Sequence, residues 1–151
     1  MRYFAALFLI ALVSPFASAQ EFKEAKVRTD IPKLAIERCQ LSNASFTAQL
    51  ETTLRSNGIK VENSARGPTF HFFLSVGEYG SDSCQGHGYL QVYSYANEVN
   101  LSWTKKRADG LLEHCLRTFS FYGGKGFEQQ ERLNSVLGDI TRQCVSLMLK
   151  K

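Results

Sequence analysis

The sequence predicts an α+β fold, a two-layer sandwich in which two helices cover one face of a mostly antiparallel sheet of four to five strands. Two stretches, residues 43–56 and 127–149, have apolar residues at helical spacing. Between them, several stretches alternate apolar and polar residues as strands do. With 151 residues, 44% of them hydrophobic, the chain can form one globular domain with its own core.

Residues 1–19 have the pattern of a secretory signal peptide. Arg2 precedes an unbroken apolar run, residues 4–13, and Ala17 and Ala19 complete an A-x-A cleavage site. The run is too short to span a bilayer, and no later stretch is apolar for long enough to be a membrane span. We therefore expect cleavage and a periplasmic or secreted protein. The alternative is a buried amino-terminal helix.

The charged residues 20–30 are expected to form a mobile terminus, and residues 31–151 a single domain. Residues 33–37 and 59–61 alternate in polarity, which predicts two short strands. The helix over residues 43–56 lies between them in the chain.

A three-stranded meander is predicted between the two helices, with strands over residues 69–79, 89–103 and 111–122. Polar residues 80–88 are expected to form a loop between the first two strands. Residues 105–110 end in Asp-Gly, which predicts a hairpin turn before the third strand.

The apolar residues of the middle strand change phase partway along it. Leu90 and Val92 are even-numbered, whereas Val99 and Leu101 are odd-numbered. A slip of one residue moves a side chain to the other face, so we predict a bulge or bend near residues 96–97. A tight hairpin at the same place is the alternative.

Four cysteines follow the predicted signal peptide, and an even number in an exported chain indicates two disulfides. Cys144 lies on the apolar stripe of the last helix, which must run back along the strand that carries Cys115. We therefore prefer the pairs Cys115–Cys144 and Cys39–Cys84, with Cys39–Cys115 or Cys39–Cys144 as alternatives. The Cys39–Cys84 pair is the less comfortable one, because a simple meander places these residues at opposite ends of the sheet.

The two helices can cover only one face of the sheet, which leaves an uncovered face rich in aromatic residues. By strand alternation that face carries His71, Phe73, Tyr79, Tyr89, Tyr93 and Tyr95. A contiguous aromatic surface often contacts a ligand or another subunit. The alternative is that tyrosine simply suits a half-exposed strand.

Nothing in the sequence indicates an enzyme, because no nucleophile-elbow, zinc-protease, Walker or dinucleotide motif is present. Cys84 and His87 have the spacing of half a zinc site. The other adjacent pair, His114 and Cys115, points to opposite strand faces, and disulfides compete for the thiols. We therefore expect no catalytic residue, no metal and no cofactor. A lone strand histidine such as His71 is more often packed than catalytic.

The formal charge of +4 is too small to indicate nucleic-acid binding, for which a dense basic stripe is expected. The run Lys105-Lys106-Arg107 is read as a solvated hairpin tip, with contact to an anionic surface as the alternative.

Several short motifs resemble those of a group of small, uncharacterised secreted bacterial proteins. They are Leu50-x3-Leu54-Arg55-x2-Gly58-Ile59-x-Val61, Pro68-x-Phe70 and Thr118-Phe119-Ser120. The order of elements is also similar to the amino-terminal α/β domain of TolB-type periplasmic proteins. The resemblance implies a helix, a strand meander and a closing helix, with no enzymatic role to transfer.

Together these observations predict an exported, disulfide-bonded, non-enzymatic domain that binds an unknown protein partner or forms a homo-oligomer. The rival hypothesis is a binder of a small molecule or envelope component on the aromatic sheet face. A concave pocket with convergent polar groups would favour the rival, and a flat face buried against a second copy would favour the oligomer.

Overall fold

The computed structural model describes residues 22–63, 67–78, 82–101 and 106–149, with the backbone alone at residues 78, 96–101 and 106–109. The predicted signal peptide lies outside the described residues. The elements are β1 (Glu24–Asp30), α1 (Lys33–Arg38), α2 (Asn43–Ser56), β2 (Lys60–Val61), β3 (Thr69–Glu78), β4 (Cys84–Leu101), β5 (Lys106–Gly123) and α3 (Phe127–Leu149).

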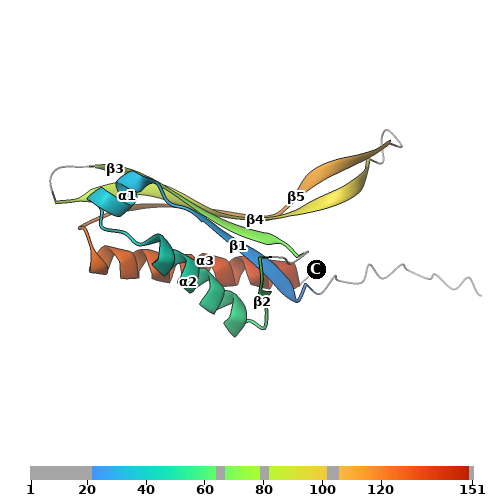
Figure 1. Cartoon of the computed structure of the whole chain (residues 1–151), viewed down its shortest axis with the longest axis horizontal. Helices are drawn as coiled ribbons and strands as arrows, with labels where there is room; N and C mark the ends of the chain where they lie inside the picture. The colour runs from blue at the N-terminus through green and yellow to red at the C-terminus, as the bar shows by residue number, and fades with distance from the viewer. Residues whose placement is uncertain (1–21, 64–66, 79–81, 102–105, 150–151) are drawn as a thin grey trace, which may run out of the picture.

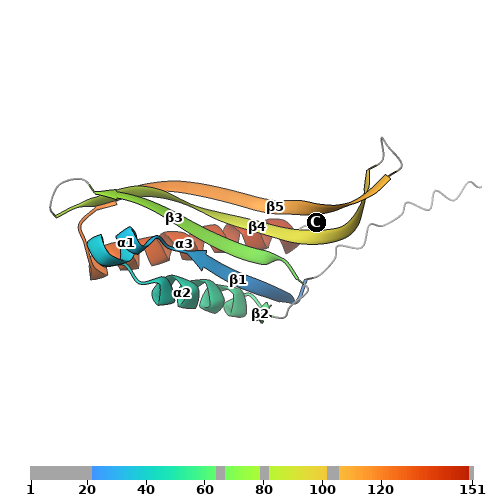
Figure 2. The same cartoon turned by 45° about the horizontal axis from the view of Figure 1, so that its top comes forward.

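One five-stranded sheet has the order β2-β1-β3-β4-β5. In Figure 1, α2 and α3 lie below the strands β3, β4 and β5, and α1 lies at the left beside β3. β1 runs parallel to β2 and β3, whereas β3, β4 and β5 form an antiparallel meander. α3 packs against β5 and α2, and α2 also packs against β1 (Figure 2). The predicted α+β sandwich is therefore confirmed, with a mixed sheet and a third, short helix.

β1 occupies the segment that we expected to be a mobile terminus. Its position between β2 and β3 makes it an internal strand of the sheet. Ala25 is fully buried and Val27 packs against the core, so the strand has an apolar face despite its charged neighbours. The charged residues of this segment do not prevent it from forming a strand, because a half-exposed strand accommodates them on its other face.

The segment over residues 33–37, predicted as a strand, is instead part of α1. The helix starts directly after Pro32, whose φ of −64° suits the beginning of a helix. Lys33 and Glu37 form an ion pair at 3.4 Å with the i,i+4 spacing that a helix favours. Five residues are too few to distinguish the period of a strand from that of a helix. Here local contacts such as this ion pair favour the helix.

The meander is longer than predicted at both connections. β4 begins at Cys84, inside the expected loop, and β5 begins at Lys106, inside the expected turn. The polar residues 80–88 were expected to form a loop, but Gly88 lies within the strand. A Cβ atom there would be 2.6 Å from the ring of Phe119, so the missing side chain makes room for that ring.

The predicted irregularity in β4 is confirmed. The β4–β5 register shifts between Ala96 and Val99, and a second shift lies between Val92 and Tyr93. Because β4 continues through this region to Leu101, the alternative of a hairpin at residues 96–97 is wrong.

The core lies between the sheet and the helices, on the predicted sheet face. α2 begins with Ser42 as its N-cap, since the Ser42 hydroxyl accepts a hydrogen bond from the Ser45 amide at 3.2 Å. The fully buried side chains from the two layers include Phe70, Phe72, Leu74, Leu90, Val92, Phe46, Leu50, Leu54 and Leu137. None of the helices in the described part of the chain is long and apolar enough to cross a membrane.

The structure contains the disulfides Cys39–Cys84 and Cys115–Cys144, the same pairs as in the preferred arrangement. Their Cα–Cα distances are 5.8 and 5.6 Å. The expected difficulty with the first bridge does not arise. β1 runs parallel to β3, so the chain leaves β1 and enters α1 at the end of the sheet where β4 begins.

Candidate functional site

The sheet surface that faces away from the helices, called the open face below, carries the predicted aromatic residues. β3 contributes His71 and Phe73, which alternate with the buried Phe70 and Phe72. Phe73 lies directly opposite Tyr89 of β4 in the strand register. Tyr79 lies outside the described residues.

The rings on the open face contact one another in a continuous series. Phe73 and Tyr89 stack with ring centroids 5.1 Å apart. The His71 ring meets Tyr89 and Tyr93 edge-on, at 6.0 and 6.4 Å. Tyr95 extends the series through an edge-on contact with Tyr93 at 5.7 Å. Such ring pairs add to the stability of neighbouring strands as well as forming a surface.

Exposure differs sharply along this series. Tyr93 is only 8% exposed, whereas Tyr95 is 76% exposed. Burial raises the pKa of the Tyr93 hydroxyl and Tyr95 raises it further, although Arg28 opposes them. Tyr93 is therefore a neutral, largely structural residue at neutral pH, and Tyr95 is the residue that offers free ring surface.

A charged group borders the aromatic series, which the sequence did not predict because β1 was read as a terminus. The Asp30 carboxylate lies 2.8 Å from His71 Nε2 and 2.8 Å from Arg28 Nη2. Partial burial raises the pKa of the Asp30 carboxyl, but hydrogen bonds from His71 and Arg28 outweigh it and hold the pKa below its usual value. This group joins β1 to β3 on the open face.

The lowered pKa of Asp30 predicts a contribution to acid sensitivity. A carboxyl whose pKa is lower in the folded state stabilises the fold above its unfolded pKa, about 3.9, and loses this contribution as pH falls through the folded value. We expect the wild type to lose more unfolding free energy than Asp30→Asn between neutral pH and pH about 3. Urea unfolding at a series of pH values measures the difference, and parallel pH profiles would contradict it.

Two leucines of β5 enlarge the open face beyond the predicted set. Leu111 pairs with Tyr95 in the register and is 51% exposed, and Leu116 pairs with Gln91 and is 43% exposed. Between them, Glu113 accepts a hydrogen bond from the Gln91 amide at 2.7 Å. The sequence shows both leucines, but placing them on the open face depends on the register shift between β4 and β5.

The half zinc site suggested by Cys84 and His87 does not form, because Cys84 is in a disulfide with Cys39. His114 instead lies 2.8 Å from the Ser94 hydroxyl, through its Nε2 atom. Among the described residues, no three His, Cys, Asp or Glu side chains are grouped closely enough to hold a metal ion.

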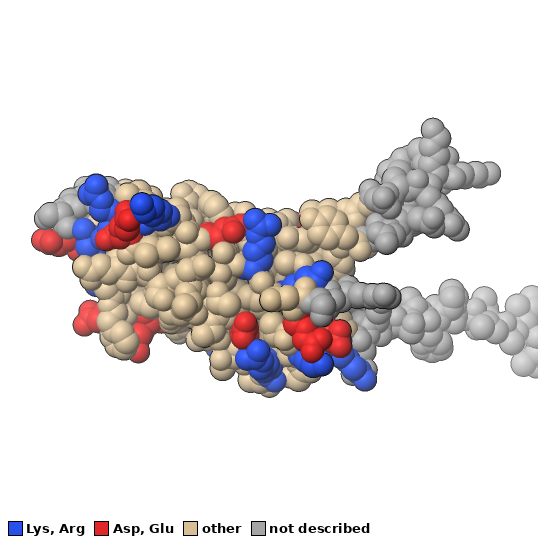
Figure 3. All heavy atoms as spheres, viewed as in Figure 1, with Lys and Arg blue, Asp and Glu red and all other residues tan. Residues whose placement is uncertain are grey.

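On the side of the molecule shown in Figure 3, charged side chains lie in several separate groups, most of which contain both signs. Uncharged surface lies between these groups. On the side shown, the two signs are interspersed rather than separated into a single-sign patch.

No protein-family model matches the chain, and no curated protein matches its sequence. Among solved structures, it is similar to a minor lipoprotein from Acinetobacter baumannii (TM-score 0.41, 11% identity, 85% of this chain and 92% of that one). It is also similar to a PelC dodecamer from Paraburkholderia phytofirmans (TM-score 0.41, 14% identity, 84% and 86%). A third is a hypothetical protein of Chlamydia trachomatis (TM-score 0.45, 8% identity, 83% and 94%).

All three similar structures are of bacterial proteins, and none of their names mentions TolB. The predicted resemblance to TolB-type proteins stays a prediction.

Proposed function

We propose that this chain is an exported, non-enzymatic domain that binds a protein surface, either a partner or a second copy of itself, through the open face. The observation that carries the proposal is the run of aromatic and leucine side chains there, ending in the exposed Tyr95, Leu111 and Leu116. Soluble monomers rarely expose contiguous apolar surface of this kind unless it has a role in binding.

Export is supported by the two disulfides, because such bonds persist in oxidising compartments such as the periplasm. The A-x-A pattern at Ala17 and Ala19 supports removal of residues 1–19. We expect the mature protein to begin at Gln20. Intact-mass measurement of the exported protein tests this, and retention of Met1 would contradict it.

A binding role fits the chemistry of the described residues better than a catalytic one. All four cysteines are in disulfides, so none offers a thiolate nucleophile. The His71–Asp30 pair has the geometry of a catalytic dyad, but the His71 ring packs between Tyr89 and Tyr93. The hydrogen bond with Asp30 explains the position of His71 without a catalytic role.

The test uses Tyr95→Thr combined with Leu116→Thr, because both side chains are exposed and threonine suits a strand. Phe73 and Tyr93 are less suitable, since both are partly or largely buried. We expect the double variant to unfold within about 1 kcal/mol of the wild type, as exposed substitutions usually do. Its self-association or partner capture should weaken at least about tenfold, the equivalent of 1.4 kcal/mol.

Sedimentation velocity over a range of concentrations measures self-association, and capture from periplasmic extract followed by mass spectrometry measures partner binding. Leu147→Gln is the matched control, because Leu147 is a similarly exposed leucine on α3, in the other layer. The proposal is wrong if the wild type neither associates nor captures a protein. It is also wrong if the folded double variant behaves as the wild type does.

A further inference from the structure

A cavity of about 180 Å³ lies between β5 and the first half of α3. β5 is the outermost strand of the sheet, and no other described strand pairs with its outer edge. The cavity walls are apolar at Phe119 and Phe121 on β5 and at Leu133 and Val136 on α3. An apolar cavity of about 150 Å³ is large enough for benzene, so this one can hold an apolar side chain.

Two polar groups at one end of this cavity lack partners. Gln129 is 3% exposed, and its Oε1 atom has no hydrogen-bond donor among the described residues. Arg132 is exposed and makes no hydrogen bond or ion pair within the described part of the chain. Gly123, at the end of β5, leaves room for both, since a Cβ there would lie 2.2 Å from Gln129 Oε1 and 3.4 Å from Arg132 Nη1.

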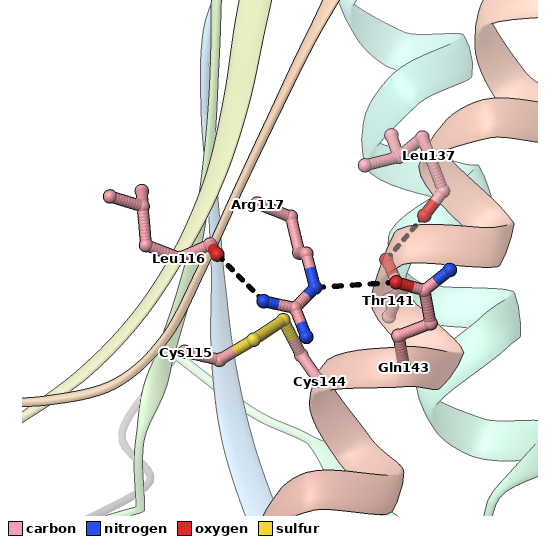
Figure 4. The surroundings of a disulfide bond; sticks show 7 residues. All are labelled: Cys115, Leu116, Arg117, Leu137, Thr141, Gln143 and Cys144. Carbon is pink, nitrogen blue, oxygen red and sulfur yellow. Dashed lines mark hydrogen bonds between the residues drawn. A yellow bond between two sulfur atoms is a disulfide. The ribbon is translucent and has the colours of Figure 1, made fainter.

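A second arginine, Arg117, lies on β5 two residues before Phe119, outside the lining of the cavity. Arg117 Nε donates to Gln143 Oε1 at 3.2 Å, and Nη1 donates to the Leu116 carbonyl at 3.1 Å. Figure 4 shows this side chain spanning from β5 to α3 beside the Cys115–Cys144 disulfide. Like Arg132, Arg117 has no carboxylate partner among the residues that the structure describes.

We call this cavity and the adjoining outer edge of β5 the groove. From these features we infer that the groove binds an extended acidic peptide segment of another protein, which adds to the edge of β5 as a further strand. The peptide backbone pairs with residues 118–122 of β5, where the edge lies between the two arginines. One apolar side chain fills the cavity, and carboxylates on either side of it pair with Arg117 and Arg132. Because alternate side chains of a strand share a face, the simplest matching pattern is acidic-x-apolar-x-acidic.

Charge complementarity favours this occupant over a second copy of the chain. A second copy that paired through β5 would bring its own Arg117 on β5 and Arg132 on α3 close to the same two cations, and like charges in close proximity oppose pairing. The cavity lies between β5 and α3, on the helix side of the sheet, whereas Tyr95, Leu111 and Leu116 are exposed on the open face. The two binding proposals are therefore tested with different variants.

The experiment titrates a blocked peptide, acetyl-Glu-Thr-Leu-Thr-Glu-amide, into the oxidised, isotope-labelled protein at low ionic strength and follows its amide resonances. Resonances of residues 118–122 and 129–136 should shift. Replacing both peptide glutamates with lysine, or the leucine with serine, should weaken binding at least about fivefold, and added salt should weaken it progressively.

Arg132→Gln should weaken binding of the acidic peptide by a similar factor, because it removes one cation and Arg132 has no structural partner to lose. Arg55→Gln, an exposed arginine of α2 paired with Glu51, is the matched control and should bind as the wild type does. A dispersed amide spectrum confirms that each variant is folded.

The inference is overturned by the absence of any shift at millimolar peptide, by shifts confined to the open face, or by unchanged affinity in folded Arg132→Gln. It is equally overturned if the lysine peptide binds as well as the glutamate peptide, or if the protein dimerises through β5 and the peptide does not compete.

Discussion

Replacing Phe72 with alanine is expected to lower the free energy of unfolding by about 3–5 kcal/mol, as for phenylalanines in other cores. Phe72 is fully buried at the centre of β3. Its ring lies 5.1 Å from that of Phe46 on α2 and stacks at 6.1 Å on Phe119 of β5. Removal leaves a cavity among side chains from three elements, which cannot all move to fill it. Equilibrium urea unfolding measures the loss.

Phe73→Ala is the matched control, because it removes the same ring from the adjacent position on the opposite sheet face. Phe73 is half-buried and stacks mainly on Tyr89, so we expect a loss of about 0.5–1.5 kcal/mol from the ring pair, plus a smaller burial contribution. Equal losses for Phe72→Ala and Phe73→Ala would mean that the two sheet faces are equally buried, which would contradict the open face.

Removing the Cys115–Cys144 disulfide by a double alanine substitution is expected to cost about 2–5 kcal/mol. The bond joins β5 to α3 across 29 residues of chain, and both cysteines are buried. Without it, the unfolded chain gains conformational freedom, and the outer strand loses its covalent link to the helix layer. Unfolding of the oxidised wild type and of the variant, under the same conditions, measures the effect.

Peptide mapping without reduction provides the control for this experiment, since it reports which cysteines are joined in the wild type. It should yield Cys115 with Cys144 and Cys39 with Cys84. In the double variant the Cys39–Cys84 peptide should persist. A different pairing in the wild type, or a stability change within about 0.5 kcal/mol, the usual range of surface substitutions, would contradict the prediction.

Long periodic segments were predictable from the sequence because many residues report the same pattern. The stripe through Leu133, Leu137 and Cys144 identified α3, and the alternation of Phe70 and Phe72 identified the buried face of β3. The phase change near Ala96 identified the bulge in β4 for the same reason, because one slip alters the parity of every later apolar residue.

Short segments were not predictable, because their local signals are weak and distant contacts decide their conformation. β1 has few apolar residues, yet its Thr29 hydroxyl lies 2.8 Å from that of Thr47 on α2, and both of its edges are paired. Gly88 lies in a segment that the sequence predicts as a loop, but in the structure it is a strand residue that makes room for the Phe119 ring. Both cases depend on residues far away in the chain, which no local window contains.

The same distinction separates the two candidate binding surfaces. The sequence alone predicted that His71, Phe73, Tyr89, Tyr93 and Tyr95 share a face. Alternation within each strand places them opposite the apolar residues that pack against the helices. Only the tertiary structure decided that Asp30 meets His71 there and that Tyr93 is buried while Tyr95 is exposed. It also decided that Arg132 lines the cavity between β5 and α3 and that Arg117 reaches Gln143 of α3, since the packing of α3 against β5 sets both contacts.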